Sequence, residues 1–142
     1  MEPAENKKYK TIFPRGEKIN NDYFSGMAWL EMLVPNDDIF NCPIGNVTFE
    51  PGVRNNWHKH PGGQILLATS GVGYFQEKDK PIQLFQAGEV IKILPDVVHW
   101  HGATPNSQFS HLAISTNPQK GIVEWLQPVT DEEYNSYSPP RE

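Results

Sequence analysis

The chain alternates short apolar runs with clusters of turn-forming residues. Runs rich in Val, Ile, Leu, Phe and Trp are bounded by Gly, Pro, Asn and Asp, which is the pattern of β-strands joined by tight turns. The predicted strands are 27–34, 44–49, 56–60, 64–69, 73–76, 82–85, 89–94, 97–101, 109–115 and 121–126. The predicted turns are EPG, HPGG, SGVG, EKDKP, QAG and LPD. Many short strands with frequent turns predict an all-β sandwich or barrel.

One segment near the C-terminus predicts a helix. In the stretch TDEEYNSY, Thr130 can cap the helix together with Glu133 three residues later. The acidic residues fall in the first turn, where the helix dipole favours them.

The length of 142 residues is typical of one domain with a sizeable core. The two ends are polar, so we expect an N-terminal arm over residues 1–20 and a tail over residues 139–142. Residues 21–138 would then form the β-barrel domain with its C-terminal helix.

Charge and composition exclude several classes of partner. The net charge of −5 argues against nucleic acid or an anionic membrane surface, because a phosphate-binding face needs a basic excess. Cys42 is the only cysteine, so neither an internal disulfide nor a cysteine-based zinc site can form. The N-terminus lacks the apolar core of a signal peptide, and no stretch has the length of a membrane span. We therefore expect a cytoplasmic protein with a small-molecule partner.

Histidines gather on common strand faces. Side chains two residues apart on a strand point the same way, so His58 shares a face with His60, and His99 shares one with His101. The fifth histidine, His111, lies in the predicted strand 109–115. In strand 44–49 the more apolar parity places Gly45, Val47 and Phe49 inside.

Several histidines inside one barrel require a physical reason. A buried polar group without a partner costs about 1–3 kcal/mol. Neutral imidazoles from His58, His60 and His99 could converge on one divalent metal, with the amide oxygen of Gln64 as a fourth ligand after the Pro-Gly-Gly turn.

A structural role is the alternative for each of these residues. A single histidine in a strand is usually a hydrogen-bonded packing residue, and Gln64 could support the ligands rather than bind the ion. His101 and His111 could serve either packing or acid–base catalysis.

Two motifs resemble those of the cupin family. The first is GVRNNWHKHPGGQILLATSG and the second is GEVIKILPDVVHWHGA. The matching positions are Gly52, His58, His60, Gln64 and Gly71 in the first motif, and Gly88 and His99 in the second. The chain departs from the family pattern where glutamine replaces glutamate at 64, where Pro95 stands one place late, and where Val97 and Ala103 replace the usual residues. The resemblance implies a single-domain cupin, which is a double-stranded β-helix or jelly-roll barrel.

Within the cupins the chain is similar to small bacterial manganese-dependent hydroxynitrile lyases, and also to cupins associated with carboxymuconolactone decarboxylases. The former resemblance implies that the metal ligands are His58, His60, Gln64 and His99. It places His101 and His111 as catalytic residues, and Gly45, Val47 and Ser115 in the substrate pocket. Manganese is the expected metal, with iron, nickel and zinc as alternatives.

Neutral ligands alone would leave the metal its full double positive charge and make it a strong Lewis acid. The favoured hypothesis is a lyase acting on a small hydroxyl- or carbonyl-bearing compound. In its cyanohydrin version, histidines in their charged form stabilise the departing cyanide. A cupin dioxygenase and a non-catalytic, metal-dependent binding domain are the alternatives. We also expect a homodimer or higher homo-oligomer that packs through strand 27–34.

Overall fold

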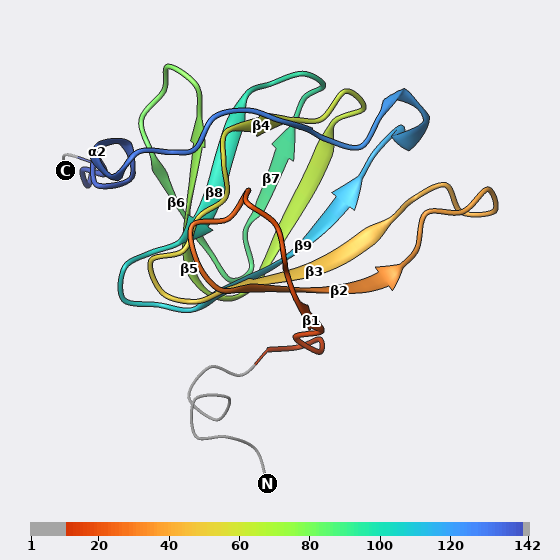
Figure 1. Cartoon of the computed structure of the whole chain (residues 1–142), viewed down its shortest axis with the longest axis horizontal. Coiled ribbons are helices and arrows are strands. Elements are labelled where there is room, and N and C mark those ends of the chain that lie inside the picture. The colour runs from red at the N-terminus through yellow and green to blue at the C-terminus, as the bar shows by residue number, and fades with distance from the viewer. Residues whose placement is uncertain (1–10, 141–142) are drawn as a thin grey trace, which may run out of the picture.

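The computed structural model describes residues 11–140, which form curled β-sheets with one short helix near the C-terminus (Figure 1). The strands are β1 (Glu17–Lys18), β2 (Ala28–Val34), β3 (Ile44–Phe49), β4 (His58–Lys59), β5 (Gln64–Glu77), β6 (Gln83–Gln86), β7 (Val90–Ile93), β8 (His99–Ala103), β9 (Phe109–Ser115) and β10 (Glu124–Trp125). The helices are the 3-10 turn η1 (Pro118–Lys120) and α2 (Asp131–Tyr134). The predicted all-β jelly-roll class with a short C-terminal helix is confirmed.

Strand β5 joins the two layers of the barrel. Its first half pairs with β9 and β7, and its second half pairs with β6 and β8. The continuous order of strands is β1-β2-β3-β9-β5-β8-β4-β10, and every pair is antiparallel. A strand shared by two sheets brings the layers together and leaves an interior between them.

The predicted turn SGVG at 70–73 is wrong, because one strand runs through it. The pairing of β5 with β9 shifts register between Ala68 and Ser70, and Gly71 takes a φ of 77°. A glycine inside an apolar run signals either a turn or a β-bulge. Here the bulge bends the strand and hydrogen bonding continues on both sides of it.

Several predicted elements are shorter in the structure. The predicted strands 56–60 and 121–126 reduce to β4 and β10, which pair at two positions, Glu124 with Lys59 and Trp125 with His58. The predicted helix 130–137 reduces to α2. Its capping box between Thr130 and Glu133 forms as predicted.

The predicted arm takes part in the sheet over its last residues, since Glu17 and Lys18 pair with Leu30 and Trp29. Residues 1–10 of the arm and residues 141–142 of the tail lie outside the described residues. The domain boundaries at 20 and 138 stay predictions. Within residues 11–140, no helix has the length and apolarity that crossing a membrane would require.

Two hydrophobic clusters fill the fold beside the histidines. The larger cluster, between the layers, is built around buried Phe49, Leu66 and Phe109. The ring of Phe49 lies 5.8 Å from the rings of both His101 and His111. The core therefore packs directly against the histidines and holds their rings in place.

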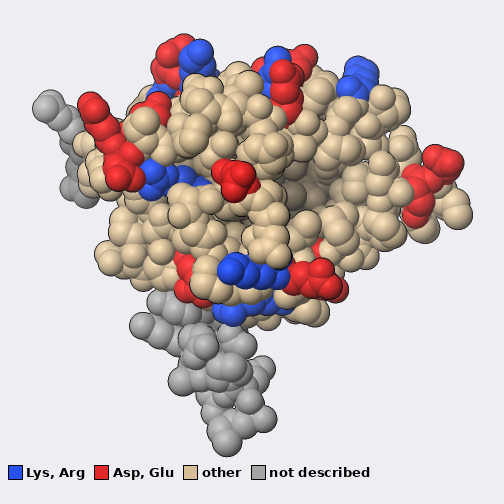
Figure 2. Space-filling model, in the orientation of Figure 1, with Lys and Arg blue, Asp and Glu red and all other residues tan. Residues whose placement is uncertain are grey.

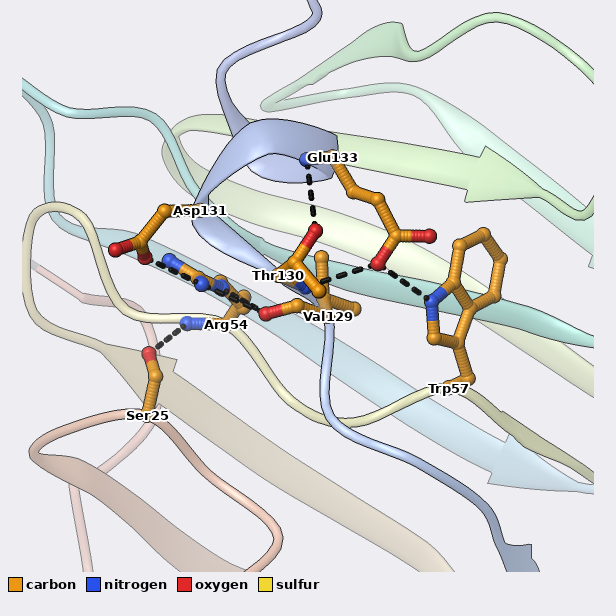
Figure 3. A network of polar contacts seen from close by, with 7 residues as sticks. All are labelled: Ser25, Arg54, Trp57, Val129, Thr130, Asp131 and Glu133. Carbon is orange, nitrogen blue, oxygen red and sulfur yellow. Dashed lines mark hydrogen bonds and ion pairs between the residues drawn. The ribbon is translucent and has the colours of Figure 1, made fainter.

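A polar network fastens the C-terminal segment to the barrel (Figure 3). The Arg54 guanidinium donates to the carbonyl oxygen of Val129 at 2.7 Å and to the Asp131 carboxylate at 2.9 Å. The Trp57 indole donates to the Glu133 carboxylate at 3.4 Å. These bonds hold the residues that follow β10 against the loop before β4.

Replacing Arg54 with alanine should lower the free energy of unfolding by about 2 kcal/mol, because the carbonyl of Val129 loses a charged donor in a partly buried place. Urea unfolding would measure the change. The control is Lys80→Ala, which breaks the exposed Lys80–Glu77 ion pair and should change stability by less than about 1 kcal/mol. Equal effects of the two substitutions would contradict the role given to Arg54.

Candidate metal centre and its cavity

Three histidines from the β4 region and β8 form one buried cluster. His58 on β4 pairs directly with His99 on β8, and His60 lies two residues beyond His58 on the same face. One ring nitrogen of each histidine lies within 4.8 Å of those of the other two. The side chains are 2%, 4% and 0% exposed for His58, His60 and His99. The three residues are therefore placed to share one ion.

Backbone carbonyls determine which ring nitrogen of each histidine is available. In all three rings Nδ1 lies at hydrogen-bonding distance from a carbonyl oxygen, which can only accept a proton. The acceptors are Asn56 for His58 (2.8 Å), Ile122 for His60 (2.6 Å) and Val97 for His99 (2.9 Å). Nδ1 therefore holds the hydrogen in each neutral ring, and Nε2 keeps a lone pair for a metal.

Unpartnered buried acceptors support the same interpretation. Nε2 of His60, Nε2 of His99 and Oε1 of Gln64 are all buried and make no hydrogen bond. Buried acceptors without a partner are destabilising, and a divalent cation would satisfy all of them at once. The donor types fit such an ion, since imidazole and amide oxygen both coordinate first-row divalent metals. The prediction that the three histidines could hold a metal is confirmed in its geometry, whereas the role of Gln64 and the identity of the metal stay predictions.

Burial keeps the three rings neutral. Loss of hydration lowers the pKa of His58, His60 and His99, and that of His99 falls to about 3. For His58 the neighbouring rings of His99 and His60 lower the pKa further. Neutral imidazole is the form that binds metal, so the site is ready for an ion at neutral pH.

A second pair of histidines lies beside the first cluster. Nε2 of His111 is 3.1 Å from Nδ1 of His101, and both side chains are buried. The side-chain amide of Asn55 approaches the His101 ring at 3.3 Å, and its oxygen accepts the His101 backbone N–H at 3.0 Å. Asn55 thus contacts both the backbone and the ring of His101, and these contacts orient the ring. Sequence reasoning missed Asn55, because nothing in its neighbourhood along the chain indicates a partner 46 residues away.

The second pair is also neutral at rest. Burial lowers the pKa of His101 well below its ordinary value and that of His111 to about 4. The expectation that charged histidines stabilise a leaving group therefore applies only after one of them has taken up a proton.

The histidines open into one cavity of about 330 Å³. Its polar part contains His58, His60, Gln64, His101 and His111, and Gly45, Val47 and Ser115 also line it. His99 belongs to the metal cluster but does not line the cavity. Eight of the nine residues predicted for the site therefore line one cavity, and the ninth, His99, lies beside it in the cluster with His58 and His60.

Apolar residues form most of the remaining cavity wall, and Asn36 and Asn55 are the polar exceptions. The apolar residues include Phe24, Leu30, Met32, Ile122, Val123 and Trp125, and among residues 11–140 no Lys, Arg, Asp or Glu lines the space. Figure 2 shows this face hollowed near its middle, with the charged side chains mostly towards its edges. Phe24 and Trp125 were not singled out from the sequence, because aromatic residues in predicted strands usually belong to the core.

The chain resembles known proteins in both sequence and structure. Residues 50–132 match the family described as the AraC-like ligand binding domain. A protein named (R)-mandelonitrile lyase from Granulicella tundricola is 38% identical over 113 residues, which is 80% of this chain and 86% of that protein. The crystal structure of a cupin-like protein from Thermotoga maritima superposes with a TM-score of 0.86 at 46% identity, covering 91% of this chain and 98% of that one. The chain belongs to the cupins.

For more distant solved structures the likeness shows the fold alone. A predicted oxalate decarboxylase from Thermotoga maritima has a TM-score of 0.64 at 24% identity, covering 70% of this chain and 90% of that one. The similarity of the cupin barrel therefore extends well beyond any one activity.

Two substitutions of Gln64 should change the metal affinity of this cupin in opposite directions. Gln64→Leu removes the buried oxygen and should weaken Mn²⁺ binding by at least about tenfold. Gln64→Glu adds a negative charge beside the cation and should tighten Mn²⁺ binding. Titration calorimetry on metal-free protein would measure both affinities. Unchanged affinity in the two variants would remove Gln64 from the ligand set.

Stability of the metal-free protein should fall as the pH drops below about 6.5. Because the five histidines have a lower pKa when folded than when unfolded, the unfolded chain binds more protons between the two values. Proton uptake by each histidine lowers the free energy of unfolding by up to about 1.4 kcal/mol for each pH unit of decrease within that window. For His111 the window extends down to about pH 4. Urea unfolding with a chelator present between pH 7 and pH 5 would measure the slope, and a flat profile would contradict it.

Proposed function

We propose that this cupin is a metal-dependent lyase that breaks a carbon–carbon bond in a small, uncharged, hydroxyl-bearing compound, in the manner of a hydroxynitrile lyase. One observation carries the proposal: a cluster of three buried neutral histidines, two of which line the cavity, lies beside a second buried pair that lines the same uncharged cavity. The first set, His58, His60 and His99, has its Nε2 atoms available for a metal. The second set, His101 and His111, is available for proton transfer.

The metal would be held by His58, His60, His99 and Gln64, and manganese is the first candidate, with iron, nickel and zinc as alternatives. When bound, it would supply Lewis acidity to an oxygen of the substrate. The remaining chemistry belongs to residues of the chain.

In cyanohydrin cleavage, a neutral imidazole of His101 or His111 takes the hydroxyl proton. The electrons of that O–H bond form the carbonyl, the bond to the nitrile carbon breaks, and its electron pair leaves as cyanide. The imidazolium then returns the proton and hydrogen cyanide departs. Because Nε2 of His111 lies 3.1 Å from Nδ1 of His101, a proton taken by one ring is stabilised by the other. The lowered pKa of both residues ensures that a free base is present at neutral pH.

Away from the proposed metal, the cavity favours an uncharged substrate body. No positively charged side chain among residues 11–140 lines the space to balance a carboxylate or phosphate. Its apolar walls would exclude water from the released carbonyl compound. The 38% identity to a protein named for cleaving (R)-mandelonitrile is consistent with such a substrate.

A non-catalytic binding domain is the second candidate, favoured by the match to AraC-like ligand binding domains. In that case the same cavity would bind a small molecule with the metal and release it unchanged. Thermal shift with metal and ligand, without turnover, would support this alternative. Oxygen consumption by iron-loaded protein would instead support a dioxygenase.

Manganese-loaded protein should release cyanide from mandelonitrile. His101→Gln should lower kcat/KM by about 100-fold or more while the protein still binds metal, because the variant loses a proton acceptor and keeps all four proposed ligands. His58→Ala should lose both metal and activity.

Trp29→Phe is the matched control, since Trp29 contacts Arg15 outside the cavity and should retain full activity. Cyanide release would be followed colorimetrically and metal content by elemental analysis. A cyanide release rate that His58→Ala leaves unchanged would overturn the proposal.

A further inference from the structure

Trp125 lies next to His58 of the proposed metal centre and lines the cavity. It is the last residue of β10 and pairs with His58 on β4. The centroids of the indole and the His58 imidazole are 4.7 Å apart, with 42° between the ring planes. A substrate group that touches the indole would therefore lie next to a proposed metal ligand.

Neighbouring aromatic rings hold the indole in one orientation. Tyr23 stacks on Trp125 with centroids 4.7 Å apart and 5° between planes. Phe24 meets it edge-on at 5.9 Å. The backbone next to Trp125 is also held, because the N–H of Leu126 donates to the carbonyl of Trp57 at 2.8 Å. The indole is thus a fixed part of the wall.

The surrounding cavity leaves room for a flat group near the ligands. Gly45, Ala113 and Ser115 present small side chains or none to the space, whereas Phe24 and Trp125 supply rings. Rings in such a wall favour stacked or edge-to-face contact with another ring. A cavity of about 330 Å³ is at the small end of the range for ligand sites, so one small ring would fill much of it.

We infer that Trp125 is a specificity-determining residue, which selects substrates carrying an uncharged aromatic group and seats that group beside the metal ligands. The inference rests on the proposed lyase function for its kinetic test, and has a separate binding test. Aliphatic substrates would lack the ring contact and should depend little on Trp125.

The kinetic test compares Trp125→Leu with wild-type protein, both loaded with manganese. The substrates are mandelonitrile, which carries a phenyl ring, and acetone cyanohydrin, which carries only methyl groups. Trp125→Leu should lower kcat/KM for mandelonitrile by about tenfold relative to acetone cyanohydrin. Trp125→Phe should restore most of the preference. Trp29→Leu is the matched control, since Trp29 does not line the cavity and should leave the ratio unchanged.

Metal content distinguishes specificity from support of His58. Trp125→Leu should keep the wild-type manganese content, with thermal melting showing that it folds. An unchanged substrate ratio would overturn the inference, and so would a loss of manganese that accounts for the whole decrease in activity.

Binding of benzaldehyde to the manganese-loaded protein gives a readout that needs no turnover. Calorimetry should show weaker binding to Trp125→Leu than to wild type and Trp29→Leu. If wild type cleaves neither cyanohydrin, the lyase proposal fails and this binding comparison alone decides the role of Trp125. Equal affinities, or no binding to wild type, would overturn it.

Discussion

The hydrogen bonds from three histidine Nδ1 atoms to backbone carbonyls are the constraint on which the site depends. They determine the tautomer of His58, His60 and His99 and turn their Nε2 lone pairs towards one another. Without a cation, Nε2 of His60 and Nε2 of His99 are buried acceptors that make no hydrogen bond. The fold therefore holds an arrangement that is unfavourable alone and favourable around a metal, which is typical of preorganised metal sites.

The C-terminal segment connects distant parts of the fold to this arrangement. The carbonyl oxygen that accepts the hydrogen bond from Nδ1 of His60 belongs to Ile122, just before β10. Further along the chain, the Arg54 guanidinium donates to the carbonyl of Val129 (Figure 3). The side-chain amide of Asn56 donates to the carbonyl of Leu126. The ring of one proposed metal ligand is thus oriented by a segment that is itself docked on the barrel. Stability of the C-terminal contacts and geometry of the metal centre are consequently linked.

The electrostatics of the cavity limit the chemistry that it supports. Desolvation makes every histidine neutral, and within the described residues the lining contains no fixed charge. A bound metal would then be the dominant charge in the space, beside a pair of weakly basic imidazoles. Such a site favours molecules that bring an oxygen to the metal and carry no second charged group, since no cationic side chain within residues 11–140 lines the cavity.

The sequence alone determined those features that depend on short-range patterns. Strand alternation placed His58 and His60 on one face, the Pro-Gly-Gly turn returned the chain at Gln64, and Thr130 with Glu133 marked the helix start. The fold class followed from the repeated strand and turn signals, and cupin membership from the motif resemblance. The tertiary structure decided what depends on residues far apart in the chain. Asn55 meets His101 across 46 positions, and Ile122 meets His60 across 62. Trp125 became a cavity wall only through pairing of β10 with β4, and the bulge at Gly71 became a bend only because partners continue on both sides. These contacts arise when the barrel closes, and no local pattern of side chains encodes which distant carbonyl or ring will be there.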